Sequence, residues 1–196
     1  MVTTEQIKAL RDETGVSVML CRKALEEAKG DFEKAKVILQ RKGADAAAKK
    51  MGRTLGAGTV AAYIHHSGSV GVLVELSSET DFVSGNEEFK TLARDIAMHV
   101  AAAKPEFLKR EDVTEETLSR AKEVLLKEVE GKPKAMQEKI LEGKLNSFFA
   151  EKILLEQPFV KNPDQTVRSL IENAIQRFGE KIEISRFTRF SVNDRP

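Results

Sequence analysis

Residues 59–83 read TVAAYIHHSGSVGVLVELSSETDFV, a stretch that predicts a β-hairpin followed by a loop. The two strands, at about 59–66 and 69–77, reverse direction at Ser67-Gly68-Ser69. In the second strand the even positions from Val70 to Leu76 are all apolar, and side chains two residues apart lie on the same face of a strand. One face of the hairpin is therefore apolar and needs other elements to cover it.

The chain after the hairpin supplies that cover. Apolar residues at helical spacing predict helices at about 86–103, 115–130, 134–152 and 165–178, with an irregular stretch between Pro158 and Pro163. The break at Gly131-Lys132-Pro133 predicts that the second and third of these form a helical hairpin. With a last strand at about 182–192, we expect residues 54–196 to form an α+β core in which a small three-stranded antiparallel sheet packs against helices.

The last strand has an irregular apolar pattern. Ile182 and Ile184 alternate with polar residues, but Phe187 and Phe190 are out of phase with each other. The pattern indicates either a β-bulge or a strand with apolar side chains on both faces. An uncovered apolar face on this strand would favour self-association.

Residues 1–53 are expected to form a separate module of three short helices and a linker. Ser17 and Asp31 are candidate N-caps, because their side-chain oxygens accept free backbone N–H groups at the start of a helix. Gly43 is a candidate stop for the third helix, although the alanines and lysines after it are also able to extend that helix. We place the domain boundary at residue 53.

The composition excludes several classes of protein. The 32 Lys and Arg residues nearly balance the 31 Asp and Glu residues, so the net charge gives no reason to expect nucleic acid or an anionic membrane as a partner. The single cysteine, Cys21, excludes an internal disulfide and is typical of a reducing, cytoplasmic compartment. No apolar segment approaches the ~20 residues that span a bilayer, and we expect neither a membrane anchor nor a secretory signal.

The sequence contains no evident catalytic, metal-binding or cofactor-binding constellation. The glycines at 52, 56 and 58 lack phosphate-loop spacing. His65 and His66 are adjacent on a strand and point to opposite faces, and His99 stands alone on a helix. Cys21 lies on an apolar helical face, where it is expected to pack rather than to react. We therefore expect a protein that is not an enzyme and needs no cofactor.

The loop Glu79-Thr80-Asp81-Phe82-Val83 places an aromatic side chain beside a carboxylate, in a type of segment that often carries function. Phe82 is a candidate for contacting a partner. The alternative is that Thr80 or Asp81 caps the backbone while Phe82 fills the local core. Periodicity does not decide between the two.

These residues carry a resemblance to the elongation factor Ts family that extends along the whole chain. Thr80-Asp81-Phe82-Val83, preceded by VLVEL at 72–76, is similar to one signature of that family, and Leu155-Glu156-Gln157-Pro158-Phe159-Val160 is similar to another. The N-terminal segment, with CRKAL at 21–25 and Gly30-Asp31, resembles the three-helix domain of the family, which is itself similar to ubiquitin-associated domains. Three matches in the right order make the resemblance specific.

The resemblance implies a guanine-nucleotide exchange factor for the translational GTPase elongation factor Tu, in both its GDP-bound and nucleotide-free states. In the family, the residues at the positions of Asp81 and Phe82 disturb the magnesium and nucleotide site of that GTPase. Thr80 and Val83 would set the conformation of the loop. Magnesium holds phosphate oxygens with strict octahedral geometry, so a small displacement of its surroundings weakens nucleotide binding.

The resemblance also implies a second contact with elongation factor Tu at Val18 and Met19. Helical spacing places Met19 opposite the apolar face that contains Cys21. The alternative is that Val18, Met19 and Leu20 pack against the other two helices. Val18 and Leu20 depart from the pattern of the family, which has methionine at the first position and commonly aspartate at the second.

One departure concerns the architecture. Longer members of the family have two related halves in their core, whereas this chain has strands for one half. The resemblance therefore implies a homodimer, in which the strand at 182–192 buries its second face against its twin.

Two other functions stay open. Three short helices also form helix-turn-helix domains, and residues 1–53 hold twelve Lys and Arg against eight Asp and Glu, so a nucleic-acid-binding module is one alternative. The basic pair Arg22-Lys23 is followed at once by Glu26-Glu27, which argues against a basic face. An adaptor module acting through these helices is the other alternative, and it leaves the loop at 79–83 without a role.

Overall fold

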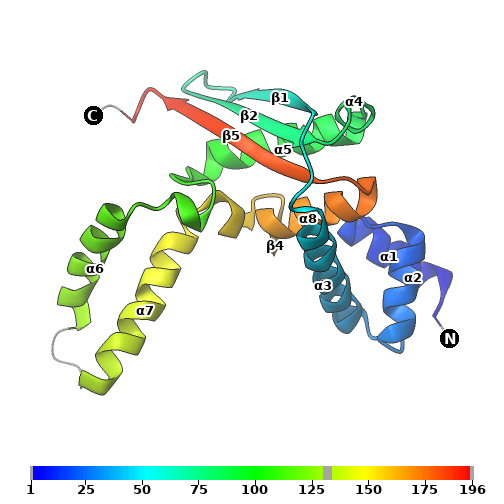
Figure 1. The fold of residues 1–196 in the computed structure, drawn as a ribbon, viewed down its shortest axis with the longest axis horizontal. Helices are drawn as coiled ribbons and strands as arrows, with labels where there is room; N and C mark the ends of the chain where they lie inside the picture. The colour runs from blue at the N-terminus through cyan, green and yellow to red at the C-terminus, as the bar shows by residue number, and fades with distance from the viewer. Residues whose placement is uncertain (1, 130–133, 195–196) are drawn as a thin grey trace.

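The chain folds into a small sheet from which two helical arms extend on the same side (Figure 1). The structure, a computed structural model, describes residues 2–129 and 134–194. The last residue of the helix expected at 115–130, and the break expected at 131–133, lie outside this range. The predicted α+β class is confirmed, with an N-terminal group of helices ahead of a three-stranded antiparallel sheet. No helix within the described ranges combines the length and the apolar character needed to cross a bilayer.

One arm is the N-terminal module, formed by α1 (Thr4–Thr14), α2 (Val18–Glu27) and α3 (Phe32–Lys50). Both predicted N-caps are confirmed, since Ser17 accepts the N–H of Leu20 and Asp31 accepts the N–H of Lys34. The boundary expected at residue 53 stays a prediction. The module has its own buried apolar cluster, made of Leu10, Val16, Cys21, Ala24, Leu25, Ala28, Ala35 and Leu39.

The predicted helix stop at Gly43 is wrong, because α3 continues to Lys50. Gly43 is buried where α3 packs against α8 (Val167–Phe178). A Cβ atom at this position would lie 2.5 Å from Nε2 of Gln176 and 3.3 Å from Cβ of Glu172. Glycine is needed here for close helix packing rather than for a left-handed turn, and the alternative of an extended third helix is confirmed.

The sheet joins β1 (Ala57–Ile64), β2 (Val70–Ser78) and β5 (Ile182–Ser191) in the order β1-β2-β5, with both pairs antiparallel. Helix α5 (Glu87–Ala103) packs on one face, as the alternation in β2 predicts. The main core lies between this face and the helices, and its larger members include Val72, Val74, Leu76, Phe89, Ile96, Val100, Ile171, Ile175, Ile182 and Ile184.

A β-bulge explains the irregular pattern of β5. Glu75 pairs with Arg186 while Leu76 pairs with Ile184, so Ser185 is an extra residue on β5. The bulge turns Phe187 toward the core and Phe190 away from it. The outer face of the sheet consequently exposes a set of large apolar side chains, namely Val60, Ile64, Leu73 and Phe190, with Val192 just beyond the strand.

The second arm is a helical hairpin of α6 (Glu115–Val129) and α7 (Lys134–Ala150), flanked by the short 3₁₀ helices η1 (Arg110–Asp112) and η2 (Leu154–Glu156). The irregular stretch expected between Pro158 and Pro163 is wrong, because β3 (Pro158–Phe159) and β4 (Asn162–Thr166) form a small antiparallel ribbon. A two-stranded ribbon consists only of edges, and an edge strand tolerates a proline that donates no ladder hydrogen bond.

Candidate partner-binding site

The loop that follows β2 contains one short helical turn, α4 (Asp81–Ser84), at the end of the sheet (Figure 1). Phe82 lies on this turn with 84% of its surface exposed. The interpretation of Phe82 as part of the core is therefore wrong. Val83, the next residue, is 3% exposed and belongs to the main core cluster. The turn thus has one apolar side chain in the protein interior and one in solvent.

The start of the loop is held by the residues that precede β5. The N–H of Thr80 donates to Oε2 of Glu180 at 3.0 Å, and its hydroxyl donates to Oε1 of the same carboxylate at 2.6 Å. In the opposite direction, the N–H of Lys181 donates to Oε1 of Glu79 at 2.5 Å. Thr80 occupies the N-cap position of α4, but its side chain makes no capping hydrogen bond. Its hydroxyl donates to Glu180 instead.

Glu79 also forms an ion pair with Arg53, whose Nη1 lies 3.1 Å from Oε1 and 3.3 Å from Oε2. Arg53 belongs to the segment between α3 and β1, so this pair ties the loop to the connection between the N-terminal module and the sheet. The N–H of Lys181 first, and the Arg53 guanidinium after it, hold the pKa of Glu79 below its ordinary value. Glu79 is therefore a charged anchor at neutral pH.

Asp81 is exposed beside Phe82. Across residues 2–129 and 134–194, no hydrogen bond or ion pair engages its carboxylate. Its backbone carbonyl accepts the N–H of Gly85 at 2.8 Å, which closes the helical turn. The loop therefore projects an aromatic ring and an unpaired carboxylate next to each other, while residues on both sides of them are fixed.

Val18 and Met19 are 50% and 62% exposed at the start of α2. The alternative that they pack against the neighbouring helices is wrong for these two side chains, but it holds for Leu20, which contacts the module's core. Helices α2 and α4 lie toward the same side of the molecule in Figure 1. The role of Val18 and Met19 in binding stays a prediction.

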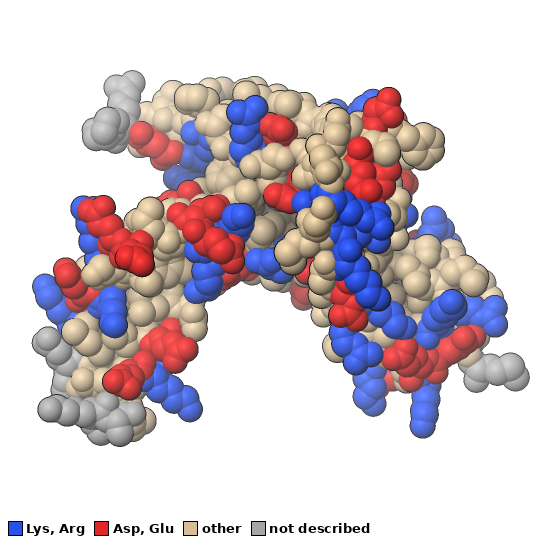
Figure 2. Space-filling model, viewed as in Figure 1, with Lys and Arg blue, Asp and Glu red and all other residues tan. Residues whose placement is uncertain are grey.

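Among the described residues, half of the basic side chains of the N-terminal module form ion pairs with carboxylates, namely Arg22, Lys34, Lys36, Arg41, Lys42 and Arg53. Arg22 contacts Glu26 at 2.8 Å, and Lys42 contacts Glu27 at 2.6 Å. Figure 2 shows acidic side chains among the basic ones on this arm. A nucleic-acid interface gathers unpaired cations along one face, so this arrangement does not favour the nucleic-acid alternative.

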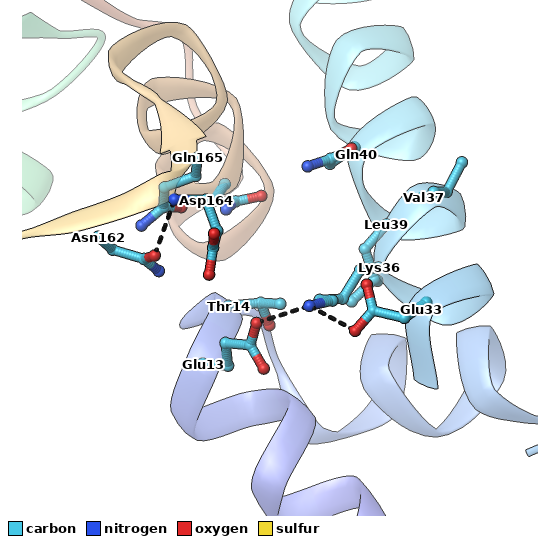
Figure 3. Close-up of a pocket in the computed structure, with 11 residues that line it drawn as sticks. Glu13, Thr14, Glu33, Lys36, Val37, Leu39, Gln40, Asn162, Asp164 and Gln165 are labelled. Atoms are coloured by element: carbon cyan, nitrogen blue, oxygen red, sulfur yellow. Dashed lines mark hydrogen bonds and ion pairs between the residues drawn. The ribbon is translucent and has the colours of Figure 1, made fainter. Parts of the chain in front are cut away.

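A cavity of about 450 Å³ is lined by residues of α1, α3, β4 and α8 (Figure 3). Lys36 lies on its wall with Nζ 2.9 Å from Glu13 and 2.8 Å from Glu33, and both carboxylates raise the pKa of the lysine. Asp164 faces the same space from β4. Its charged lining is thus acidic overall, which is unfavourable for a phosphate-bearing ligand.

His99 is fully buried and serves a structural purpose. Its Nδ1 accepts the N–H of Val160 at 3.2 Å, so Nε2 carries the proton that it shares with Oε1 of Gln157 at 2.9 Å. Burial lowers the pKa of His99, which keeps the ring neutral. Cys21 is also buried, and burial raises the pKa of its thiol. The described residues contain no group of three His, Cys, Asp or Glu arranged to hold a metal ion.

Sequence reasoning missed the residues that hold the loop. Arg53, Glu180 and Lys181 lie far from the loop in the sequence, in segments that carry no motif of their own. Glu79 stands next to the signature at 80–83, but its backbone partner, the N–H of Lys181, is 102 positions away. The antiparallel pairing of β2 with β5 brings Glu180 and Lys181 to the loop, and the pairing of β1 with β2 brings Arg53 there.

Comparison with known proteins gives a consistent result. The profile of the family described as Elongation factor TS matches residues 33–194. An Elongation factor Ts from Carboxydothermus hydrogenoformans is 53% identical over 196 residues, which cover 99% of this chain and 90% of the relative. Those from Moorella thermoacetica and Thermosipho melanesiensis are 48% and 47% identical over 99% of this chain, and the matches cover 97% and 100% of the two relatives.

Proposed function

The chain belongs to the elongation factor Ts family, and we propose that it is the guanine-nucleotide exchange factor of elongation factor Tu. Its family acts in the elongation step of protein biosynthesis. In the proposed cycle, the chain binds elongation factor Tu with GDP, promotes release of the GDP, and leaves when GTP binds. It works in the cytoplasm by binding alone, without a cofactor and without catalysing a covalent reaction.

The exposure of Phe82 is the observation that carries this proposal. A phenyl ring that is 84% exposed has most of its apolar surface still to bury, and burial in a complex is favourable. Asp81, beside it, supplies a charged hydrogen-bond acceptor that is not committed to another described residue. The pair is suited to enter a partner and compete for groups around a bound magnesium ion.

Linkage explains how such an entry speeds exchange. If binding of the chain weakens GDP binding by some factor, GDP weakens binding of the chain by the same factor. Magnesium demands near-ideal octahedral geometry, so a wedge that shifts its surroundings loosens both the ion and the phosphates it bridges. GTP then restores the site and releases the exchange factor.

Stopped-flow release of a fluorescent GDP analogue from elongation factor Tu tests the proposal. The parent is expected to accelerate release at concentrations below that of the GTPase. Phe82→Ala should lower kcat/KM about 10- to 100-fold, since burying a phenylalanine side chain contributes about 1.5–3 kcal/mol. Val124→Ala, which trims an exposed apolar residue on α6, is the matched control and should match the parent. A parent that leaves the release rate unchanged would refute the proposed function.

The proposal includes a homodimer through the outer face of the sheet. Val60, Ile64, Leu73 and Phe190 form an exposed apolar surface there, which favours burial against an equivalent face. Light scattering is expected to give the mass of two chains for the parent and of one chain for Phe190→Glu. Phe82→Glu changes a phenylalanine that is even more exposed but lies elsewhere, and it should leave the dimer intact. A parent with the mass of one chain would contradict the dimer.

A further inference from the structure

The ends of β2 and β5 are joined by a reciprocal set of hydrogen bonds, which we call the clasp and define as Glu79, Thr80, Glu180 and Lys181. The side chain of Glu79 accepts the backbone N–H of Lys181, and the side chain of Glu180 accepts the backbone N–H of Thr80. These bonds lie directly beyond the last strand pair, Ser78 with Ile182. Carboxylates therefore extend the ladder at the point where the two backbones diverge.

Arg53 connects the clasp to the segment that follows α3. Its guanidinium pairs with Glu79, and its backbone carbonyl accepts a hydrogen bond from Nζ of Lys181 at 3.3 Å. The backbones also approach closely here, because a Cβ atom at Gly56 would lie 3.1 Å from the carbonyl oxygen of Glu79. Three segments that are distant in the sequence are thus fixed to one another at the start of the Phe82 loop.

We propose that Glu79, Glu180 and Arg53 are positioning residues that hold Phe82 outward before the partner arrives. The inference rests on the proposed function and adds to it the contacts that hold the loop at 79–83 in its binding conformation. Phe82 is 84% exposed, and among the described residues no hydrogen bond or ion pair engages the side chain of Asp81, so α4 is held from beneath by Val83 and at its start by the clasp. A loop held in its binding conformation loses less conformational entropy when it binds.

If the clasp acts by positioning Phe82, its removal should matter only when Phe82 is present. A general effect on the stability of the fold would not depend on Phe82. Glu180→Ala removes both acceptors of Thr80, and Arg53→Ala removes the ion pair with Glu79. Each is expected to lower kcat/KM for GDP release about 5- to 20-fold in the parent. In a Phe82→Ala background the same changes should have less than about a twofold effect, because the side chain they position is already absent.

Two further variants sharpen the comparison. A single nitrogen of Arg53 makes both contacts with Glu79, so Arg53→Lys should restore most of the activity lost in Arg53→Ala. Arg120→Ala breaks an exposed ion pair with Glu116 on α6 and should leave the rate unchanged. Equal losses from Glu180→Ala in the parent and Phe82→Ala backgrounds would overturn the inference, since that pattern indicates a structural effect independent of Phe82.

Amide hydrogen exchange measures whether the clasp is formed in the protein alone, without elongation factor Tu. The N–H of Thr80 is expected to be protected in the parent, and Glu180→Ala should accelerate its exchange at least tenfold while leaving the centre of β2 unchanged. A parent that does not accelerate GDP release would show that the proposed function is wrong. Independently of that result, unchanged hydrogen exchange at Thr80 in Glu180→Ala would show that the clasp does not hold the loop. If the parent is active and Glu180→Ala equals it, the proposed function stands and the positioning role is wrong.

Discussion

Gly43→Ala tests how tightly the N-terminal module is joined to the core. In most helix interiors this change is stabilising, because alanine exceeds glycine in helix propensity by about 0.8–1 kcal/mol. Gly43 differs because it is buried at the contact of α3 with α8. The new methyl group would lie 2.5 Å from Nε2 of Gln176, closer than a Cβ atom approaches a neighbouring heavy atom, so the Gln176 side chain would have to move.

The expected cost exceeds the gain in propensity. Nε2 of Gln176 donates to the carbonyl of Leu39 at 3.0 Å, and displacing it forfeits about 0.5–1.5 kcal/mol. Overpacking against Glu172, whose Cβ would be 3.3 Å away, adds about 1–3 kcal/mol. With the propensity gain of about 1 kcal/mol subtracted, Gly43→Ala should lower the free energy of unfolding by about 0.5–3.5 kcal/mol.

Urea unfolding followed by circular dichroism measures this difference. Gly143→Ala is the matched control, because a Cβ atom at that position of α7 would meet nothing within 4 Å, and it should stabilise the chain by up to about 1 kcal/mol. In a Gln176→Ala background, the cost of Gly43→Ala should be smaller by about 0.5–1.5 kcal/mol, because the hydrogen bond from Gln176 to Leu39 is already absent. If Gly43→Ala stabilises the parent as Gly143→Ala does, the close contact of α3 with α8 is wrong.

Two further predictions concern His99 and Met19. Because burial lowers the pKa of His99 in the folded chain, the unfolded chain binds a proton more readily, and the free energy of unfolding should fall as pH drops below about 6.5, by up to about 1.4 kcal/mol per pH unit until the folded-state pKa is reached. His99→Gln should lose this slope in urea titrations, and an equal slope in both proteins would contradict the assignment. Met19→Ser should leave the urea midpoint unchanged, because Met19 is 62% exposed, and should weaken binding to elongation factor Tu about fivefold by calorimetry. Equal affinity would remove Met19 from the contact.

Features that depend on nearby residues were predictable from the sequence. The apolar alternation in β2 gave its buried face, where Val72, Val74 and Leu76 are at most 1% exposed. The caps at Ser17 and Asp31 follow from side-chain oxygens three residues before the N–H groups they accept. Each of these patterns involves residues that are close together in the sequence, so it can be recognised without knowledge of the tertiary structure.

Features that depend on tertiary contact were not predictable. A glycine after a helical segment is typical of a helix end, and only the packing of α8 explains why Gly43 lies inside a continuous helix. The exposure of Phe82 has no periodic signal, because α4 is too short to have an apolar face. Lys181 and Glu180, the partners of Glu79 and Thr80 just before β5, are 102 and 100 residues away, where no local pattern marks them.

Residues 172–181 support both of the proposed partner-binding sites. Gln176 binds α3 and so fixes the N-terminal module that exposes Met19, while Glu180 and Lys181 bind the loop that exposes Phe82. Gly179 joins the two parts with a φ angle of 74°, which glycine adopts without strain. The separation of Met19 from Phe82 is therefore set by a short, folded connection rather than by the linker after α3. A partner that touches both sites meets a surface that is already arranged, which explains why Glu180→Ala is expected to lower the exchange rate although Glu180 is not itself a proposed contact.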